Sequence, residues 1–210
     1  MAIDDLLDEH EQSERVLTWL RRNGVGLVGG VLLGLALILG WQWWKTQRAN
    51  KAQQAGEQYQ TALKTLNDKD LKKAQAQFAA LNDSAYGALA ALNLAKAQLD
   101  ANQRDAAIAT LRGAHTTDAG LQRILDQRLA RLLIDAGKGE DALKALGAAD
   151  DAVSLEVRGD AQAALGRRDQ ARKTYQDALT KLDVAAPQRR LLELKLTDVG
   201  GTPAKPEAST

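Results

Sequence analysis

Charged and apolar residues are distributed very unevenly along this chain. No charged residue occurs between Arg22 and Lys45, and the uncharged run closes on the tryptophan-rich sequence WQWW. At about 1.5 Å per residue, a helix over residues 23–44 reaches roughly 33 Å, which is enough to cross the hydrocarbon of a bilayer. The pattern therefore predicts a transmembrane helix over residues 23–44.

Two other interpretations of this segment fit it less well. A cleavable export signal has an apolar core of about 7 to 15 residues and a small-residue cleavage site, whereas this segment leads into tryptophans typical of a membrane interface. A buried helix of a soluble protein would normally keep a polar face. We therefore expect a permanent membrane anchor.

Three glycines of the predicted span recur at every fourth position and so share one helix face. They are Gly26, Gly30 and Gly34. Such a stripe lets a second helix approach closely, which predicts a transmembrane helix contact at these residues. Glycine is also frequent in membrane spans in general, so a stripe without a specific partner stays open as the alternative.

Residues 45–198 have the composition of helices. They are rich in Ala, Leu, Lys, Gln, Asp and Arg, and contain a single proline, Pro187. Pairs of small residues recur twelve positions apart, each followed four positions later by a large side chain. The four sets are Ala62, Ala74 and Phe78; Ala95, Ala107 and Leu111; Ala130, Ala142 and Leu146; and Gly159, Ala171 and Tyr175. Repeated units of this kind predict helical hairpins that bury their faces by stacking.

Each hairpin should turn five residues before its second small residue. These positions are Lys69, Asn102, Gly137 and Gly166. They lie in polar or glycine-containing stretches, which suit the left-handed backbone that commonly ends a helix. The pattern resembles the tetratricopeptide repeat, most closely in GDAQAALGRRDQARKTYQDAL, and implies an all-α solenoid of about four hairpins.

The sequence thus divides into four parts. We predict a short acidic segment at residues 1–22, the transmembrane helix at 23–44, a repeat domain at 45–198 and a disordered tail at 199–210, where Gly, Pro, Ser and Thr prevail. Six acidic and three basic residues give the first segment a charge of −3, which leaves +4 for the remainder of a chain whose formal net charge is +1. Neither value suggests a nucleic-acid-binding protein, which would carry a strongly basic patch.

Enzyme chemistry finds little support in the sequence. The chain has no cysteine, and its two histidines, His10 and His115, lie far apart. No serine lies in a nucleophile motif, and the glycines of GVGLVGG lack the ending of a phosphate-binding loop. We therefore predict a non-enzymatic protein with no catalytic residue, no metal site, no cofactor and no small-molecule substrate.

The whole arrangement resembles the YfgM family of bacterial inner-membrane proteins. Its closest stretches are VGGVLLGLALILGWQWWKTQ and QQAGEQYQTAL. The resemblance implies an ancillary subunit of the SecYEG translocon in the bacterial inner membrane, with a membrane-anchored periplasmic chaperone as a further partner. It also implies a cytoplasmic N-terminus and a periplasmic repeat domain, an orientation that the nearly equal numbers of Lys and Arg on the two flanks of the span leave open.

Partner binding should use the first helix of each hairpin, because these helices line the inner curve of a repeat stack. By repeat position, the partner-binding candidates are Tyr59, Lys96, Asp100, Gln127, Arg131, Glu156 and Asp160. This face mixes both charge signs, and Leu63 and Ile124 stand at two positions where some tetratricopeptide domains grip a terminal carboxylate. Capture of a terminal carboxylate is therefore disfavoured. The resemblance to the YfgM family implies an interaction subunit that links protein export to periplasmic chaperones. The alternative is an anchored repeat scaffold that organises cell-wall synthesis or outer-membrane insertion.

Overall fold

The computed structural model describes residues 4–82 and 84–203 of the 210-residue chain. Within these residues the chain forms nine helices and no strand, as the sequence predicts. The helices are α1 (Asp4–Asn67), α2 (Leu71–Ala79), α3 (Gly87–Asp100), α4 (Arg104–Gly113), α5 (Ala119–Asp135), α6 (Gly139–Leu146), α7 (Ala152–Ala164), α8 (Arg168–Thr180) and α9 (Arg189–Asp198).

The chain divides into two units, Met1–Gln53 and Gln54–Thr210. Helix α1 is continuous through this boundary, so its last turns belong to the second unit. The helix predicted for residues 23–44 is therefore part of a much longer helix. The second unit begins at Gln54, whereas the sequence predicts a repeat domain from residue 45, and the side chains of residues 45–53 are exposed.

The first unit is an exposed apolar helix. It contains one stretch long and apolar enough to cross a membrane, and no part of that stretch is buried. Near its end, the Trp41 and Trp44 rings lie 5.4 Å apart, and the Arg48 guanidinium carbon lies 3.9 Å from the centre of the Trp44 ring. An aromatic pair with a cation on its polar side is the arrangement expected where a helix leaves a membrane.

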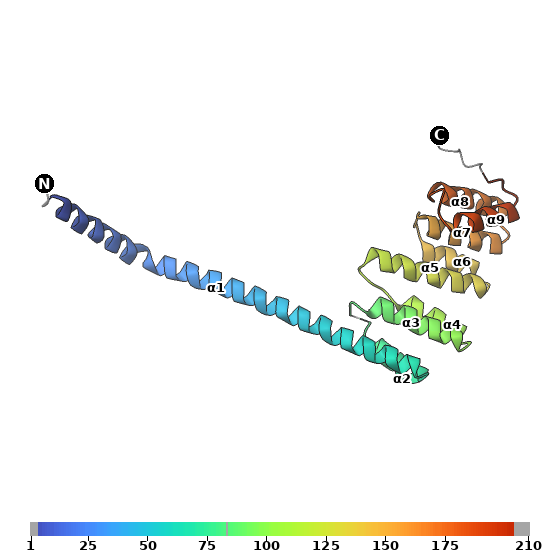
Figure 1. Ribbon diagram of the computed structural model, residues 1–210, viewed down its shortest axis with the longest axis horizontal. Coiled ribbons are helices and arrows are strands. Elements are labelled where there is room, and N and C mark those ends of the chain that lie inside the picture. Colours follow the sequence, from blue (N-terminus) through green and yellow to red (C-terminus); the bar gives the residue numbers. More distant parts are fainter. Residues whose placement is uncertain (1–3, 83, 204–210) are drawn as a thin grey trace. The chain divides into compact units, whose positions relative to one another are not determined.

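The second unit is a stack of helical hairpins. Its hairpins are the end of α1 with α2, α3 with α4, α5 with α6, and α7 with α8, while α9 packs on α8 (Figure 1). The small residues of the repeat pattern lie where the helices cross, and six of them have no exposed surface. These are Ala62, Ala74, Ala107, Ala130, Ala142 and Ala171. The large residues that follow are buried as well, so the predicted repeat alignment is the packing pattern of the domain.

The turns within the hairpins also lie where the sequence places them. Lys69, Asn102, Gly137 and Gly166 all have a positive φ, between 59° and 75°. The residue after each turn donates its backbone N–H to a carbonyl of the preceding helix, as Gln103 does to Gln98 and Arg167 does to Gln162. The left-handed residue thereby satisfies an end carbonyl that would otherwise lack a partner.

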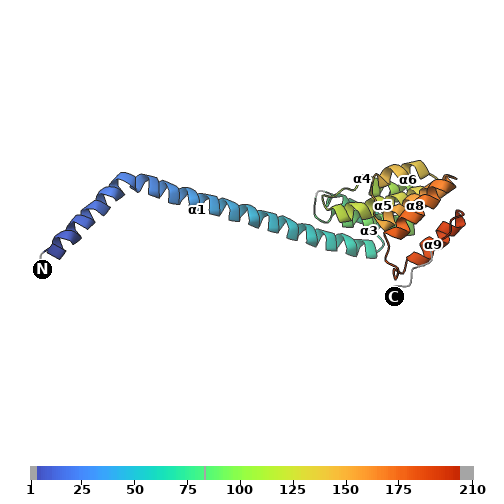
Figure 2. The same cartoon turned by 90° about the horizontal axis from the view of Figure 1, so that it is seen from above.

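Helix α9 closes the stack (Figure 2). Its Leu192 and Leu196, together with Val199, are buried against Tyr175 and Leu179 of α8. The packed domain therefore extends past residue 198, and Val199 lies in the core rather than in the predicted tail. Residues 204–210 of that tail lie outside the described residues.

Candidate functional site: a cleft between two repeat helices

The first helices of the second and third hairpins, α3 and α5, enclose a cleft of about 520 Å³. On α3, Leu92, Lys96 and Leu99 form one stripe at i, i+4 and i+7. On α5, Ile124, Arg128 and Arg131 form a matching stripe. Asn93, Ala95, Leu111 and Leu132 complete the lining. The volume lies within the range of about 300 to 1,000 Å³ typical of ligand-binding clefts.

Three cations border this apolar cleft. Lys96 and Arg128 are exposed and Arg131 is half-buried. In the described parts of the chain none of the three forms an ion pair. Ile124 is 42% exposed, although the adjacent Leu125 is buried. The cleft thus combines uncovered apolar surface with uncompensated positive charge.

Two of the seven predicted partner-binding residues, Lys96 and Arg131, line this cleft. Asp100 is exposed at the end of α3 and lies outside the lining. Sequence reasoning missed Arg128 and the apolar residues of both stripes as binding candidates. The i, i+4, i+7 spacing is visible in the sequence, but it also fits ordinary helix surface, so the spacing alone could not identify them.

Tyr59 is used within the fold. Its hydroxyl oxygen accepts a hydrogen bond from Asn93 Nδ2 at 2.9 Å, and its ring stacks on Tyr86 at 5.2 Å between centres. Burial raises the pKa of Tyr59 above its ordinary value, so the side chain stays neutral. Tyr59 therefore ties the last turns of α1 to α3.

Gln127 is also held inside the domain. It is only 9% exposed, and its Nε2 donates to Ser154 Oγ at 2.9 Å and to Asp151 Oδ1 at 3.1 Å. Asp151 caps the N-terminus of α7 by accepting from the Ser154 N–H. Burial alone would raise the pKa of Asp151, but the hydrogen bonds from Ser154 and the nearby Arg123 guanidinium hold it below its usual value. Gln127 thus joins α5 to the capped end of α7.

Glu156 and Asp160 of α7 share one cation of α9. Lys195 Nζ donates to Glu156 Oε1 at 2.6 Å and to Asp160 Oδ2 at 2.8 Å, and the Tyr175 hydroxyl donates to Asp160 Oδ1 at 2.7 Å. Burial alone would lower the pKa of Lys195, but these two carboxylates outweigh it and raise the pKa above its ordinary value. Both acids therefore already have a cationic partner within the fold, although one lysine balances only one of the two negative charges.

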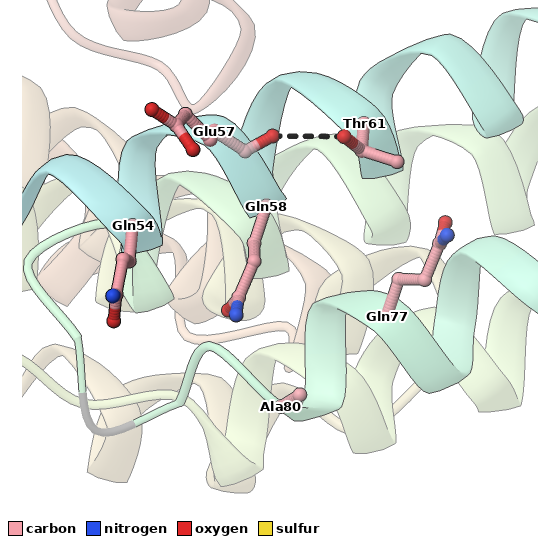
Figure 3. Close-up of a pocket in the computed structure, with 6 residues that line it drawn as sticks. All are labelled: Gln54, Glu57, Gln58, Thr61, Gln77 and Ala80. Atoms are coloured by element: carbon pink, nitrogen blue, oxygen red, sulfur yellow. Dashed lines mark hydrogen bonds between the residues drawn. The ribbon is translucent and has the colours of Figure 1, made fainter. Parts of the chain in front are cut away.

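A second cleft, of about 410 Å³, lies between the end of α1 and α2 (Figure 3). Gln54 and Gln58 of α1 point into it from one side and Ala80 faces them, while the Thr61 hydroxyl donates to the Glu57 carbonyl at 2.9 Å. The Gln77 amide lies at its edge and points away from the other two amides. The residues that line this cleft include no large apolar side chain and no cation, so it makes a weaker candidate than the α3/α5 cleft.

Comparison with known proteins identifies the type of chain. Residues 18–201 match the family of tetratricopeptide repeat-like domains. A protein of Escherichia coli K12, the "Ancillary SecYEG translocon subunit", is 32% identical over 200 residues, which is 91% of this chain and 97% of that protein. This chain belongs to the family of ancillary SecYEG translocon subunits.

Other members of the family are more distant but are aligned over nearly their whole length. Proteins of the same name from Haemophilus influenzae and Neisseria gonorrhoeae are 29% and 26% identical, and the matches cover 82% and 90% of this chain and 89% and 96% of those proteins. The family model covers residues 18–201, which include both the apolar part of α1 and the repeats of this chain. The family predicted from the sequence is thereby confirmed.

The comparisons do not test the glycine stripe of α1. A methyl group added at Gly26, Gly30 or Gly34 would meet nothing within 4 Å. The face is open to another helix, and a contact there stays a prediction. In the described part of the chain, no three His, Asp or Glu side chains gather as metal ligands would.

Proposed function

We propose that this protein is a membrane-anchored interaction subunit associated with the SecYEG translocon, linking the export of secreted proteins to periplasmic chaperones. The observation that carries the proposal is the near end-to-end match to proteins named as ancillary subunits of that translocon. The long apolar helix and the stack of repeats give the two physical requirements of such a role, a fixed place in the membrane and a surface for a partner.

The anchor is the exposed apolar part of α1 in the bacterial inner membrane. Its large side chains are exposed along the whole stretch, as Val25, Leu33 and Leu39 illustrate, and only lipid or another membrane helix would cover so much apolar surface. The N-terminus then lies in the cytoplasm and the repeat domain lies in the periplasm. The Gly26, Gly30 and Gly34 face is where a translocon helix would pack.

The repeat domain supplies the partner surface. Of the seven inner-face residues predicted from the sequence, Lys96 and Arg131 border the open cleft and Asp100 lies outside it at the end of α3. The other four, Tyr59, Gln127, Glu156 and Asp160, already have partners within the domain. The two basic residues are therefore the ones that a protein partner would contact. We assign the protein no catalytic activity and no cofactor, in keeping with a role in binding alone.

Co-purification from membranes in mild detergent tests this function. The full chain should recover the SecYEG channel and a periplasmic chaperone, and a fragment that begins at Gln54 should recover less channel because it lacks the high local concentration that the anchor provides. Crosslinking in native membranes, followed by mass spectrometry, would identify neighbours on both sides. If the neighbours are cell-wall or outer-membrane assembly proteins and the channel is absent, the protein is an envelope scaffold instead.

The glycine face can be tested in the same assay. Replacing Gly26, Gly30 and Gly34 together by Leu should reduce recovery of the channel, because the added side chains hold a partner helix away. Adding bulk on the opposite side of the helix, with Val28→Phe and Leu35→Phe, is the matched control and should leave recovery unchanged. Equal recovery from both variants would show that this face makes no specific contact.

A further inference from the structure

The first helices of the four hairpins, α1, α3, α5 and α7, follow one another in the stack and are followed by α9, which gives four gaps between neighbours. Polar side chains join the helices at three of these gaps. Asn93 donates to Tyr59 between α1 and α3, Gln127 donates to Ser154 between α5 and α7, and Lys195 pairs with two acids of α7 between α9 and α7. In the described residues, no hydrogen bond or ion pair between side chains joins α3 to α5. The α3/α5 gap is instead the cleft of about 520 Å³.

The α3/α5 cleft also carries positive charge that is not compensated by nearby carboxylates. Glu156 and Asp160, on the first helix of the fourth hairpin, are paired with Lys195, whereas Lys96, Arg128 and Arg131 have no carboxylate partner among the described residues. Asp100 and Asp135 end their helices beyond the cleft and do not line it. Among the described residues, the α3/α5 cleft therefore combines apolar surface and positive charge that both lack a partner.

We propose that the α3/α5 cleft binds an amphipathic segment of a partner protein in which Asp or Glu side chains flank Leu, Ile or Phe. The leucines and Ile124 receive the apolar side chains, and Lys96, Arg128 and Arg131 pair with the flanking carboxylates. This inference rests on the proposed function as an interaction subunit, because it names the chemistry that the repeat domain recognises.

The geometry fits this occupant better than other anions. Each stripe covers about 10 Å along its helix, at about 1.5 Å per residue, which matches two turns of a helical segment. A small free anion would not use the apolar floor. A site for a single-stranded nucleic acid normally has aromatic side chains on which the bases stack, and the residues that line this cleft include none. An arginine pair can grip carboxylates in a bidentate manner, which adds orientation to the attraction.

Peptide titration of the full chain in nanodiscs of zwitterionic lipid tests the proposal. The probe is a fluorescent peptide of about four helical turns, with Leu on one face and Glu beside it. Its controls carry Gln or Lys at every Glu position. The acidic peptide should bind about tenfold more tightly than the Gln version, and added salt should reduce the difference because exposed charges are screened.

Paired variants identify the site. Arg128→Glu with Arg131→Glu should weaken the acidic peptide about tenfold and should improve binding of the Lys peptide. The matched control is Arg168→Glu with Arg190→Glu, two exposed arginines of α8 and α9 with the same change in net charge, and it should leave both affinities almost unchanged. Circular dichroism melts of the variants show whether each is folded.

A second pair of variants tests the apolar side chains that line the cleft. Ile124→Gln should weaken binding about fivefold, because it removes apolar contact from the centre of the cleft. Leu191→Gln on α9 is the control, since Leu191 is similarly exposed, at 53% against 42% for Ile124, and lies far from the lining.

Three results would overturn the proposal. The first is equal affinity for the acidic and Gln peptides, and the second is equal loss of binding in the cleft and control variants. The third is binding of anionic phospholipid vesicles that depends on Arg128 and Arg131 while the peptide does not bind, which would make the cleft a lipid contact. Failure of the intact protein to recover the SecYEG channel, with peptide binding retained, would refute the proposed function and leave the cleft assignment standing.

Discussion

Gly159 offers the sharpest test of the repeat packing. It stands at the first small position of the fourth hairpin, where the other three hairpins have alanine. A methyl group at Gly159 would lie 2.3 Å from Cε1 and 2.5 Å from Cδ1 of Tyr175. Carbon atoms in good contact are about 3.5 to 4.0 Å apart, so the ring would have to move by more than about 1 Å.

The Tyr175 ring has little freedom to move. It is 2% exposed, and its hydroxyl is fixed by the hydrogen bond to Asp160. We therefore expect Gly159→Ala to lower the free energy of unfolding by an amount in the upper part of the range of about 1 to 3 kcal/mol for overpacking. In a domain of this size the melting temperature should fall by about 4 to 10 °C.

A second substitution should relieve the clash. Tyr175→Leu removes the ring, and the double variant then has the alanine and leucine pairing of the two middle hairpins. Those pairs are Ala95 with Leu111 and Ala130 with Leu146. The double variant should be more stable than the sum of the single effects by about 1 to 2 kcal/mol.

Urea unfolding of a soluble fragment, residues 54–210, followed by far-UV circular dichroism, measures these changes. Gly113→Ala is the matched control, because a methyl group there meets nothing within 4 Å, and it should stabilise α4 by about 0.4 to 1 kcal/mol. If Gly159→Ala is as stable as Gly113→Ala, or if the double variant shows no coupling, the close approach of α7 and α8 does not limit stability and the reasoning is wrong.

Three further predictions concern the packing, the charge network and the topology. Ala171→Leu should lower the free energy of unfolding by about 1 to 3 kcal/mol in melts of the same fragment, because Ala171 has no exposed surface. Arg168→Ala should change it by less than about 0.5 kcal/mol. Equal melting temperatures of the two variants would contradict the hairpin alignment. Lys195→Met should cost about 1.5 to 3 kcal/mol at about pH 8. The pKa of Lys195 is raised in the folded state, so its contribution to stability is full below the unfolded value of about 10.4 and is lost as pH rises through the folded pKa. In urea titrations, the stability difference between the parent protein and Lys195→Met should therefore shrink in strong alkali. A difference that stays constant with pH would argue against the network. Alkaline phosphatase fused after Ala208 should be active in cells, and an inactive enzyme beside a fluorescent cytoplasmic reporter would reverse the proposed topology.

The fold was predictable because its determinants are local in the sequence. A small residue at a helix crossing, a left-handed turn five residues before the next one and a large residue four positions later are all set by spacing within one hairpin. That is why Lys69 and Asn102 could be placed at turns although neither is glycine, and both have a positive φ. The burial of Val199, directly after α9, was missed because it depends on packing against α8, and nothing in the sequence after residue 198 reveals that contact.

The candidate site was predictable only in part, because it depends on contacts between hairpins. The repeat position places Gln127 on an inner helix, but only the structure shows that Ser154, on the next hairpin, accepts its hydrogen bond. Glu156 resembles a free acid in the sequence because Lys195 lies 39 residues further along the chain. Contacts between hairpins over such separations depend on how each repeat is rotated on its neighbour, which hairpin spacing does not determine.

Because of these contacts, the gaps between neighbouring first helices differ in how easily a partner could bind in them. Polar side chains hold α1 to α3, α5 to α7 and α7 to α9, so a partner that entered any of these gaps would first have to break hydrogen bonds that the fold already makes. At the α3/α5 gap a partner gains contact with apolar surface and loses none of these bonds. Specificity in this domain would then arise from the α3/α5 gap, which no side-chain hydrogen bond or ion pair crosses among the described residues, and a partner need recognise only two of the hairpins.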